Sequence, residues 1–160
     1  MKIRAATGND FAELIRIFTS SVHGLATEHY DAEQRSAWAP NAPDEGAWRE
    51  KFDRLWTWVA EEEGQLRGFI SHDLNGHVDL LYVAPGAARR GVASALWREV
   101  ESLLVFEGAR QATTAASLVA KPFFESHGFV TMEEQTVIRS GVSLRRFALR
   151  KILTSDAAER

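Results

Sequence analysis

A strand, a short turn and the start of a helix follow one another in residues 79–96, and this stretch limits the possible folds more than any other. The run 78–83 is apolar and partly β-branched, as expected of a buried strand, and a Pro-Gly pair at 85–86 marks its end. A helix is predicted over 92–106, where apolar residues recur with helical spacing, and Gly108 provides its stop. The stretch therefore indicates an α/β fold in which this strand and helix are neighbours.

The turn between this strand and helix carries two arginines and a glycine, namely Arg89, Arg90 and Gly91. The first N–H groups of a helix have no partner within the helix, and the helix dipole adds partial positive charge there. Such a helix start suits a phosphate or pyrophosphate. Gly91 has no Cβ and lets a ligand approach the backbone, and Ala93 is small as well. We interpret the turn as an anion-binding site, and the alternative is an ordinary connection with two solvated arginines.

Two common phosphate-binding motifs do not match this turn. The spacing of Gly86 and Gly91 agrees with the P-loop of nucleotide-binding proteins. That loop continues with Lys and then Ser or Thr, whereas this chain has Val92 and Ala93. The dinucleotide-binding pattern G-x-G-x-x-G is absent from the sequence. The sequence therefore argues against both kinds of nucleotide site.

A third pattern does match. Segment 88–93, Ala-Arg-Arg-Gly-Val-Ala, resembles the acyl-CoA pyrophosphate loop of the GNAT N-acetyltransferase superfamily, Gln/Arg-x-x-Gly-x-Gly/Ala. Ala88 departs from that pattern, so Arg89, Arg90 or the backbone alone must supply its contact. Segment 120–129, Ala-Lys-Pro-Phe-Phe-Glu-Ser-His-Gly-Phe, is similar to the second GNAT signature, Ala-x-x-Phe-Tyr-Glu-x-x-Gly-Phe. The motifs occur in the expected order, and the resemblance covers nearly the whole chain. An uncharacterised bacterial subgroup of the family is most similar, judged by residues 29–30, 36–38 and 121–124.

Length and composition are those of one globular domain, at 160 residues with 45% apolar and 26% charged residues. We expect the domain to span 1–153 and a loose tail to occupy 154–160. The formal net charge of −3 argues against a nucleic-acid-binding protein that relies on overall charge. The absence of cysteine excludes disulfides, a thiolate nucleophile and cysteine-based zinc sites. Without a signal-like or membrane-spanning apolar run, we expect a cytoplasmic, metal-free monomer or homodimer with no nucleic-acid or membrane partner.

The remaining segments predict alternating helices and strands. A capping box of Asp31 and Gln34 is expected to begin one helix, and Asn75-Gly76 is a hairpin turn before the central strand. The resemblance implies the GNAT fold, α/β with a mixed, mostly antiparallel sheet whose central strands splay apart, flanked by helices. Helices are expected over 11–18, 31–38, 44–55 and 117–126, and strands over 3–6, 56–60, 66–71, 111–115, 129–134 and 143–151.

The resemblance also implies acetyl-CoA as co-substrate, lying between the splayed strand 78–83 and the strand 111–115. N–H groups along a splayed strand can polarise the thioester carbonyl. Ser117 stands where the family often has an asparagine that contacts CoA. The residues expected to bind the cofactor are Leu81, Tyr82, Val83, Arg89, Arg90, Gly91, Val92, Ala93, Ser94, Ser117 and Phe124.

One departure from the family pattern concerns the residue that would act as the general acid. Phe124 stands where GNAT enzymes often use a tyrosine to protonate the leaving CoA thiolate, and its side chain has no proton to give. Tyr82 and Tyr30 are the only tyrosines, so a phenolic acid would be one of them. The alternative is that the thiolate leaves without assistance.

Two residues of the central strand are candidates for the base that deprotonates the amine. His77 falls where some GNAT proteins have a glutamate base, and histidine titrates near neutral pH. Asp79 lies two residues nearer to the expected reaction centre. In an unbroken strand both side chains would share one face with Leu81 and Val83. A solvated histidine after the hairpin turn is an equal alternative for His77.

The resemblance implies that the acceptor is an amine of a small molecule, attacked directly in a ternary complex, and Tyr30 and Trp38 favour an aromatic one. His29, Tyr30 and Trp38 lie in the segment that borders the acceptor cleft in GNAT proteins, and we expect them to bind it. Packing on the core is an equal alternative for the two aromatic residues. A catalytically weak acyl-CoA-binding or sensor module is the alternative to an N-acetyltransferase, because Phe124 removes the usual acid.

Overall fold

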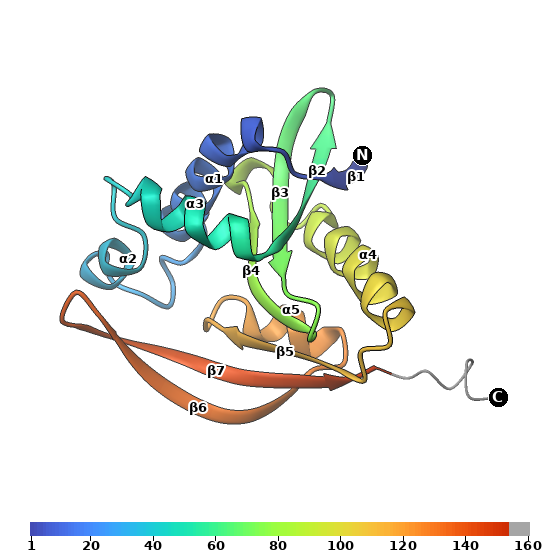
Figure 1. The fold of residues 1–160 in the computed structure, drawn as a ribbon. Coiled ribbons are helices and arrows are strands. Elements are labelled where there is room, and N and C mark those ends of the chain that lie inside the picture. The colour runs from blue at the N-terminus through green and yellow to red at the C-terminus, as the bar shows by residue number, and fades with distance from the viewer. Residues whose placement is uncertain (154–160) are drawn as a thin grey trace.

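The computed structural model describes residues 1–153, which form a seven-stranded sheet with helices on both faces (Figure 1). The strand order is β1-β2-β3-β4-β5-β7-β6, and every neighbouring pair is antiparallel except β4 and β5. The predicted mixed, mostly antiparallel α/β fold is confirmed. The strands are β1 (Lys2–Ala5), β2 (Trp56–Glu62), β3 (Gln65–His72), β4 (His77–Val83), β5 (Gln111–Ala116), β6 (Val130–Arg139) and β7 (Val142–Ile152).

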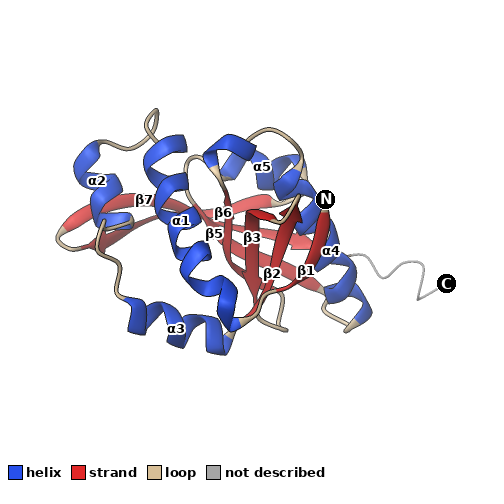
Figure 2. Cartoon of the chain, turned by 90° about the horizontal axis from the view of Figure 1, so that it is seen from above, coloured by secondary structure: helices blue, strands red, loops and turns tan. Residues whose placement is uncertain are grey.

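The helices divide between the two faces of the sheet (Figure 2). One face is covered by α1 (Phe11–Leu25) and α3 (Glu45–Arg54), with α2 (Ala32–Trp38) beside β7. The other face is covered by α4 (Val92–Phe106) and α5 (Lys121–Ser126). Two short 3-10 turns, η1 (Gly8–Asp10) and η2 (Pro85–Ala87), precede α1 and α4. None of the helices within the described part is long and apolar enough to cross a membrane.

Each face of the sheet has its own apolar core. The α4 face buries Trp97 and Leu96 against Ile70 of β3. The α1 face buries Leu14 and Phe18 against Phe69, the neighbour of Ile70 on the same strand. Alternation along β3 thus sends successive side chains into different cores, as a strand covered on both faces requires.

Several helix ends agree with the sequence prediction. The Gln34 backbone N–H donates to the Asp31 carboxylate over 2.7 Å, and the Asp31 N–H donates to the Gln34 side chain over 2.9 Å. The capping box that begins α2 is therefore confirmed. Helix α4 spans the predicted 92–106, between Gly91 and Gly108, whose φ values are +81° and +86°. Those backbone conformations favour glycine and fix both ends of the helix.

The C-terminal third of the chain differs from the prediction at two places. Helix α5 begins at Lys121, not Ser117, because the Ser117 hydroxyl accepts the Ala120 N–H over 3.1 Å in a preceding turn. The last hairpin is longer than predicted, since β6 continues to Arg139, which pairs with Val142. Most residues of β6 are exposed at the sheet edge. The sequence therefore lacks the alternation of apolar and polar residues that would have indicated the full length of this strand. The predicted tail 154–160 lies outside the described residues.

Candidate active site

The two central strands pair only at one end. Strands β4 and β5 are in register at His77 with Thr113 and at Val78 with Thr114, and their pairing stops there. On its other side, β4 pairs with β3 up to Val83, the last residue of the strand. The predicted splay of the central strands is therefore present. It leaves one edge of β4 without a partner strand beyond Val78, so main-chain groups along this edge are available to a ligand.

A β-bulge in β4 corrects the predicted order of its side chains. Ser71 of β3 pairs with Leu80 and the adjacent His72 pairs with Val78, so Asp79 has no partner residue. The bulge reverses the alternation that an unbroken strand would keep. Leu81 and Val83 therefore pack against the core of the α4 face, whereas Leu80 and Tyr82 belong to the core of the α1 face. The expectation that Leu81 and Val83 share the face of His77 and Asp79 is wrong for this reason.

The turn before α4 keeps its backbone open. Gly91 is the N-cap of α4 at φ +81°, and a Cβ built there would meet no protein atom within 4 Å. Arg89 also has a positive φ, +63°. Gly91 is thus required by its own conformation, and the space in front of it is free for a ligand. Ala93 and Ser94 are half-buried in the first turn of the helix behind it.

The two arginines of this turn differ in their surroundings. Arg90 lies 3.5 Å from the Glu62 carboxylate at the end of β2, which also lies 3.7 Å from Arg67. Arg89 has no carboxylate within 4 Å among residues 1–153. Because its charge is not paired within the described chain, Arg89 is the better placed of the two to meet a phosphate.

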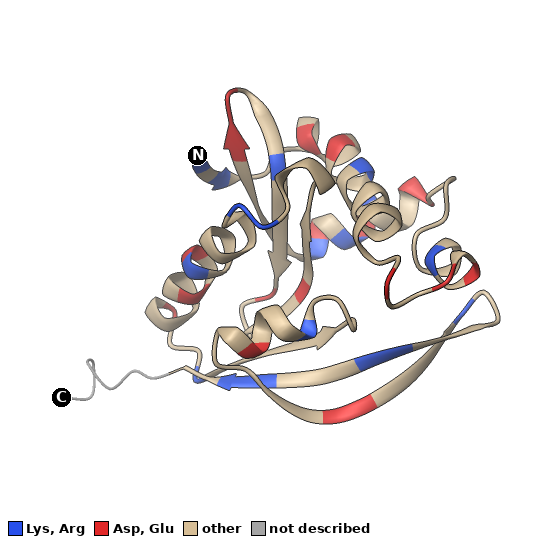
Figure 3. Ribbon diagram, turned by 180° about the vertical axis from the view of Figure 1, so that it is seen from behind, with Lys and Arg blue, Asp and Glu red and all other residues tan. Residues whose placement is uncertain are grey.

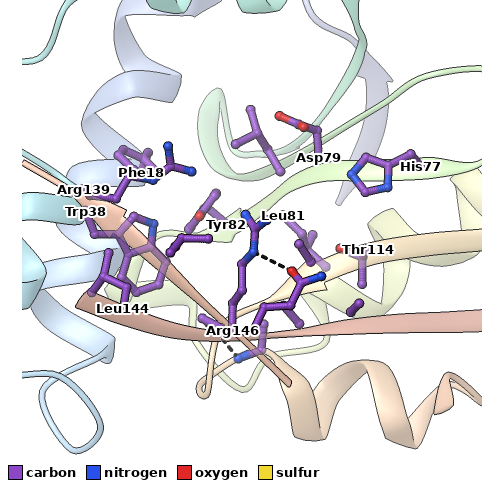
Figure 4. A pocket seen from close by; sticks show the side chains of 18 of the residues that line it. Phe18, Trp38, His77, Asp79, Leu81, Tyr82, Thr114, Arg139, Leu144 and Arg146 are labelled. Atoms are coloured by element: carbon purple, nitrogen blue, oxygen red, sulfur yellow. Dashed lines mark hydrogen bonds between the residues drawn. The ribbon is translucent and has the colours of Figure 1, made fainter. Parts of the chain in front are cut away.

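A cleft of about 890 Å³ opens on the sheet face that carries α1 to α3 (Figure 4). Its walls come from β4, β5, β6 and β7, from the segments of α1, α2 and α3 above them, and from α5, which supplies Phe124. No group of three or more potential metal ligands occurs within residues 1–153. The cleft is lined by aromatic residues, Phe18, Tyr30, Trp38, Trp48, Tyr82 and Phe124, and by charged or titratable residues, Asp44, Lys51, His77, Asp79, Arg139, Arg145, Arg146 and Arg150.

His77 and Asp79 both line this cleft, at the point where β4 and β5 separate (Figure 4). The His77 ring shares a hydrogen bond of 2.8 Å between Nδ1 and the Thr113 hydroxyl, which leaves Nε2 free of any protein partner in the described chain. Asp79 lies 3.2 Å from the Lys51 ammonium of α3. An imidazole and a carboxylate thus both line the cleft beside the open edge, which is a suitable arrangement for moving a proton.

Comparison with known proteins identifies the family. The Acetyltransferase (GNAT) domain matches residues 26–151. YafP, an uncharacterised N-acetyltransferase of Escherichia coli K12, is 39% identical over 150 residues, which cover 94% of this chain and 95% of YafP. The chain belongs to the GNAT acetyltransferase family.

Solved structures agree with this membership of the GNAT family. A GCN5-related N-acetyltransferase from Rhodopseudomonas palustris is 32% identical, with a TM-score of 0.91 over 95% of each chain. The PaiA N-acetyltransferase from Thermoplasma acidophilum, solved in complex with coenzyme A, has a TM-score of 0.78 at 17% identity, over 94% of this chain and 98% of PaiA. The first supports the family, and the second supports the fold.

The second GNAT signature lies where α5 packs on the sheet. Phe124 is 2% exposed, and its ring meets that of Phe129 edge-on at 5.0 Å between centroids. It also lines the cleft. The His127 ring that follows α5 shares a 3.0 Å hydrogen bond with the Ser94 hydroxyl of α4. The two GNAT signatures, distant in sequence, are thus in direct contact.

Neither Tyr30 nor Tyr82 is well suited to act as a general acid. Burial raises the pKa of Tyr30, whose hydroxyl donates to the Arg145 carbonyl and accepts the Leu118 N–H, each over 2.9 Å. Burial also raises the pKa of Tyr82, an effect only partly opposed by Trp38. The Tyr30 hydroxyl joins three segments of the fold, and the Tyr82 hydroxyl remains protonated well beyond neutral pH.

The acceptor-side residues predicted from sequence fall into two groups. Trp38 and Tyr30 line the cleft, with ring centroids 5.3 Å apart. His29 is exposed and is not among the residues that line it. The sequence analysis missed Lys51 and Arg146, because they come from α3 and β7 and no local pattern connects either to the GNAT motifs.

Proposed function

We propose that this GNAT protein transfers the acetyl group of acetyl-CoA to the amine of a small molecule, by direct attack in a ternary complex. The observation that carries the proposal is the open edge of β4, bounded by the Gly91 turn at one end and by His77 and Asp79 in the cleft. The open edge of β4 thus runs between the start of α4, which suits an anion, and two side chains that can transfer a proton, His77 and Asp79. The coenzyme A bound in the PaiA structure, which has the same fold, supports the choice of cofactor.

The cofactor would lie along this edge. We place its pyrophosphate on the N–H groups at the start of α4, with Arg89 or Arg90 adding charge. The pantetheine and thioester would follow the backbone of Leu81, Tyr82 and Val83, where an N–H group can stabilise the oxyanion that forms on the thioester carbonyl. The remaining contacts in this placement are Val92, Ala93, Ser94, Ser117 and Phe124.

The amine must lose a proton to attack. In our proposal the Asp79 carboxylate holds the incoming ammonium, and the His77 imidazole takes its proton directly or through a water molecule. The neutral nitrogen then attacks the thioester carbon, the C–N bond forms, and the C–S bond breaks. The electron pair of the C–S bond leaves with the CoA thiolate. The acylated nitrogen releases its second proton to the solvent or to the thiolate, which gives the neutral amide.

The thiolate leaves without a side-chain acid in this proposal. Phe124 has no proton to donate, and the phenols of Tyr82 and Tyr30 have raised pKa values. A thiol has a pKa of about 8.5, so proton transfer to its thiolate from a phenol whose pKa is above about 10 is unfavourable. Water can protonate the thiolate after it has left. The same Phe124 is the observation that favours the second candidate, an acyl-CoA-binding module with little activity.

The test combines binding with turnover. Gly91→Ala adds a Cβ in the space we assign to the pyrophosphate, and calorimetry should show at least a tenfold weaker acetyl-CoA affinity. Gly108→Ala is the matched control, since that glycine has φ +86° and equally open surroundings at the other end of α4. Equal affinities for the two variants would contradict the cofactor placement. Release of free CoA with members of an amine panel is expected, and tight binding without release from any amine would favour the sensor.

A further inference from the structure

We infer that the acceptor is a zwitterionic amine, such as an amino acid, whose carboxylate binds Arg146 and Arg139 while its ammonium binds Asp79. This inference rests on the proposed acetyl transfer and names the class of acceptor. Its basis is a set of unpaired guanidinium groups in a cleft of a protein whose formal net charge is −3.

The hairpin of β6 and β7 supplies the positive charge (Figure 3). Along β7, Phe147 and Leu149 belong to the core of the α4 face, so Arg146 and Arg150, which alternate with them, face the cleft. Figure 4 shows the Arg146 side chain extending from β7 toward β4.

These guanidinium groups have no acidic partner. Arg146 donates through Nε to the Gln135 side chain over 3.0 Å, which orients the guanidinium and leaves its two terminal nitrogens available. Arg146, Arg139 and Arg150 have no carboxylate within 4 Å among the residues that the structure describes. A half-buried guanidinium with two free N–H edges matches a carboxylate in geometry and charge.

The cofactor phosphates do not account for these arginines. The described residues that line the cleft include none from the turn 89–94, where we place the pyrophosphate. Arg146 faces the side of α1 to α3, whereas that turn leads into α4 on the opposite face, which the cleft reaches at Phe124 of α5. An anion bound at Arg146 would therefore not be the pyrophosphate of the cofactor. The acceptor is the molecule that would occupy the side of α1 to α3.

The opposite charge and the apolar wall complete the site. Asp79 lies in the same cleft beside the open edge of β4, 3.2 Å from the Lys51 ammonium, and an acceptor ammonium would share or replace that contact. Phe18, Trp38 and Trp48 line the wall formed by α1, α2 and α3, where an apolar side chain can pack. Carboxylate, ammonium and apolar body thus each have a separate partner, which is the pattern of an amino acid with an apolar side chain.

The experiment uses matched acceptors with and without the carboxylate. Phenylalanine, methionine and tryptophan are each compared with their amide and with the amine that lacks the carboxyl group, as kcat/KM per unprotonated amine. We expect the acid to be preferred over both analogues by about 10- to 100-fold in at least one series. Arg146→Gln should remove this preference, and Arg146→Lys should keep only part of it, because lysine has charge without the planar fork.

Lys151→Gln is the matched control on the same strand. Lys151 pairs with Glu101 of α4, lies over the Trp97 ring and is not among the residues that line the cleft, so the preference for the acid should persist. Analogues without the carboxylate preferred in every series, or an Arg146→Gln loss that is equal for acid and amide, would overturn the inference and leave acetyl transfer intact.

A binding measurement separates this inference from the proposed function. If no amine releases CoA, the proposed transfer fails, and calorimetry of the N-acetylated acids against the CoA-loaded protein decides the carboxylate site. Binding that Arg146→Gln weakens at least tenfold, and Lys151→Gln does not, supports the site. Absent binding, or binding that is equal in both variants, overturns it.

Discussion

Strand β4 has a paired edge, where it meets β3, and an open edge, where its pairing with β5 stops after Val78. Two histidines lie at the same level of the sheet, one beside each edge, and their rings have opposite surroundings. His72 of β3, opposite Val78 on the paired edge, is 0% exposed. Its Nε2 accepts the Trp58 indole N–H over 3.0 Å, so Nδ1 carries the hydrogen that is donated to the Asp73 carbonyl over 2.8 Å. His77, on the open edge, lines the cleft, and within residues 1–153 the one hydrogen-bond partner of its ring is the Thr113 hydroxyl.

The difference shows how one strand serves both stability and chemistry. On the paired edge, polar groups satisfy one another and burial lowers the pKa of His72, so its ring stays neutral. On the open edge, the ladder between β4 and β5 stops after Val78, and polar groups face the cleft. Substitutions on the paired edge should therefore change stability, and those on the open edge should change activity.

The largest expected effect is on the open edge. His77→Gln keeps a hydrogen-bonding group near Thr113 and removes the base, so kcat/KM should fall by about 10²- to 10⁴-fold. The free energy of unfolding should change by less than about 0.5 kcal/mol. Steady-state kinetics and urea unfolding measure the two quantities. His29→Gln, an exposed histidine outside the cleft, is the control, and comparable activity losses in both variants would remove His77 from the mechanism.

A glycine on the paired edge gives the next largest effect. A Cβ added to Gly68 of β3 would lie 2.9 Å from the Tyr82 carbonyl and 3.0 Å from a Val92 methyl group. Gly68→Ala should therefore destabilise the protein by about 1–3 kcal/mol. Gly86→Ala is the control, because its Cβ would meet nothing within 4 Å. Thermal or urea unfolding provides the measurement, and equal stability of the two variants would refute the tight contact.

The pH dependence of stability tests the buried histidine. Because the pKa of His72 is lowered in the folded state, the unfolded chain binds a proton that the folded chain does not. Stability should be constant above pH 6.5 and should fall as the pH decreases below it, by at most about 1.4 kcal/mol per pH unit for this group. His72→Gln should flatten the difference between pH 5 and 7, measured by urea unfolding. An unchanged slope would show that other groups cause it.

The smallest expected effect concerns the phenol next to the open edge. Since burial raises the pKa of Tyr82, its hydroxyl does not titrate below pH 10, and Tyr82→Phe should change kcat by less than about threefold. The turnover profile should show a single rising limb from amine deprotonation. The outcome against this prediction is a bell-shaped profile whose alkaline limb disappears in Tyr82→Phe, because that result would identify Tyr82 as the acid.

Local signals in the sequence were sufficient for the turn and the helix that follows it. Gly91 and Gly108 are the residues that the two ends of α4 require, since both have positive φ. The capping box at Asp31 and the two GNAT signatures are likewise local patterns, and each depends on residues a few positions apart. For this reason the family, the fold class and the glycine turn before α4 could be predicted without coordinates.

Tertiary structure alone decided which side chains meet in the cleft. The bulge at Asp79 arises from pairing with β3, and it turns Leu81 and Val83 away from His77, which the sequence of β4 cannot show. Arg146 reaches the cleft because β7 crosses beside β5, although it lies 67 positions after Asp79 in the sequence. Periodicity describes the neighbours of a residue along one element, whereas register and bulges depend on contacts between elements. The sequence therefore determined the scaffold and the turn before α4, and packing determined which charged side chains line the cleft.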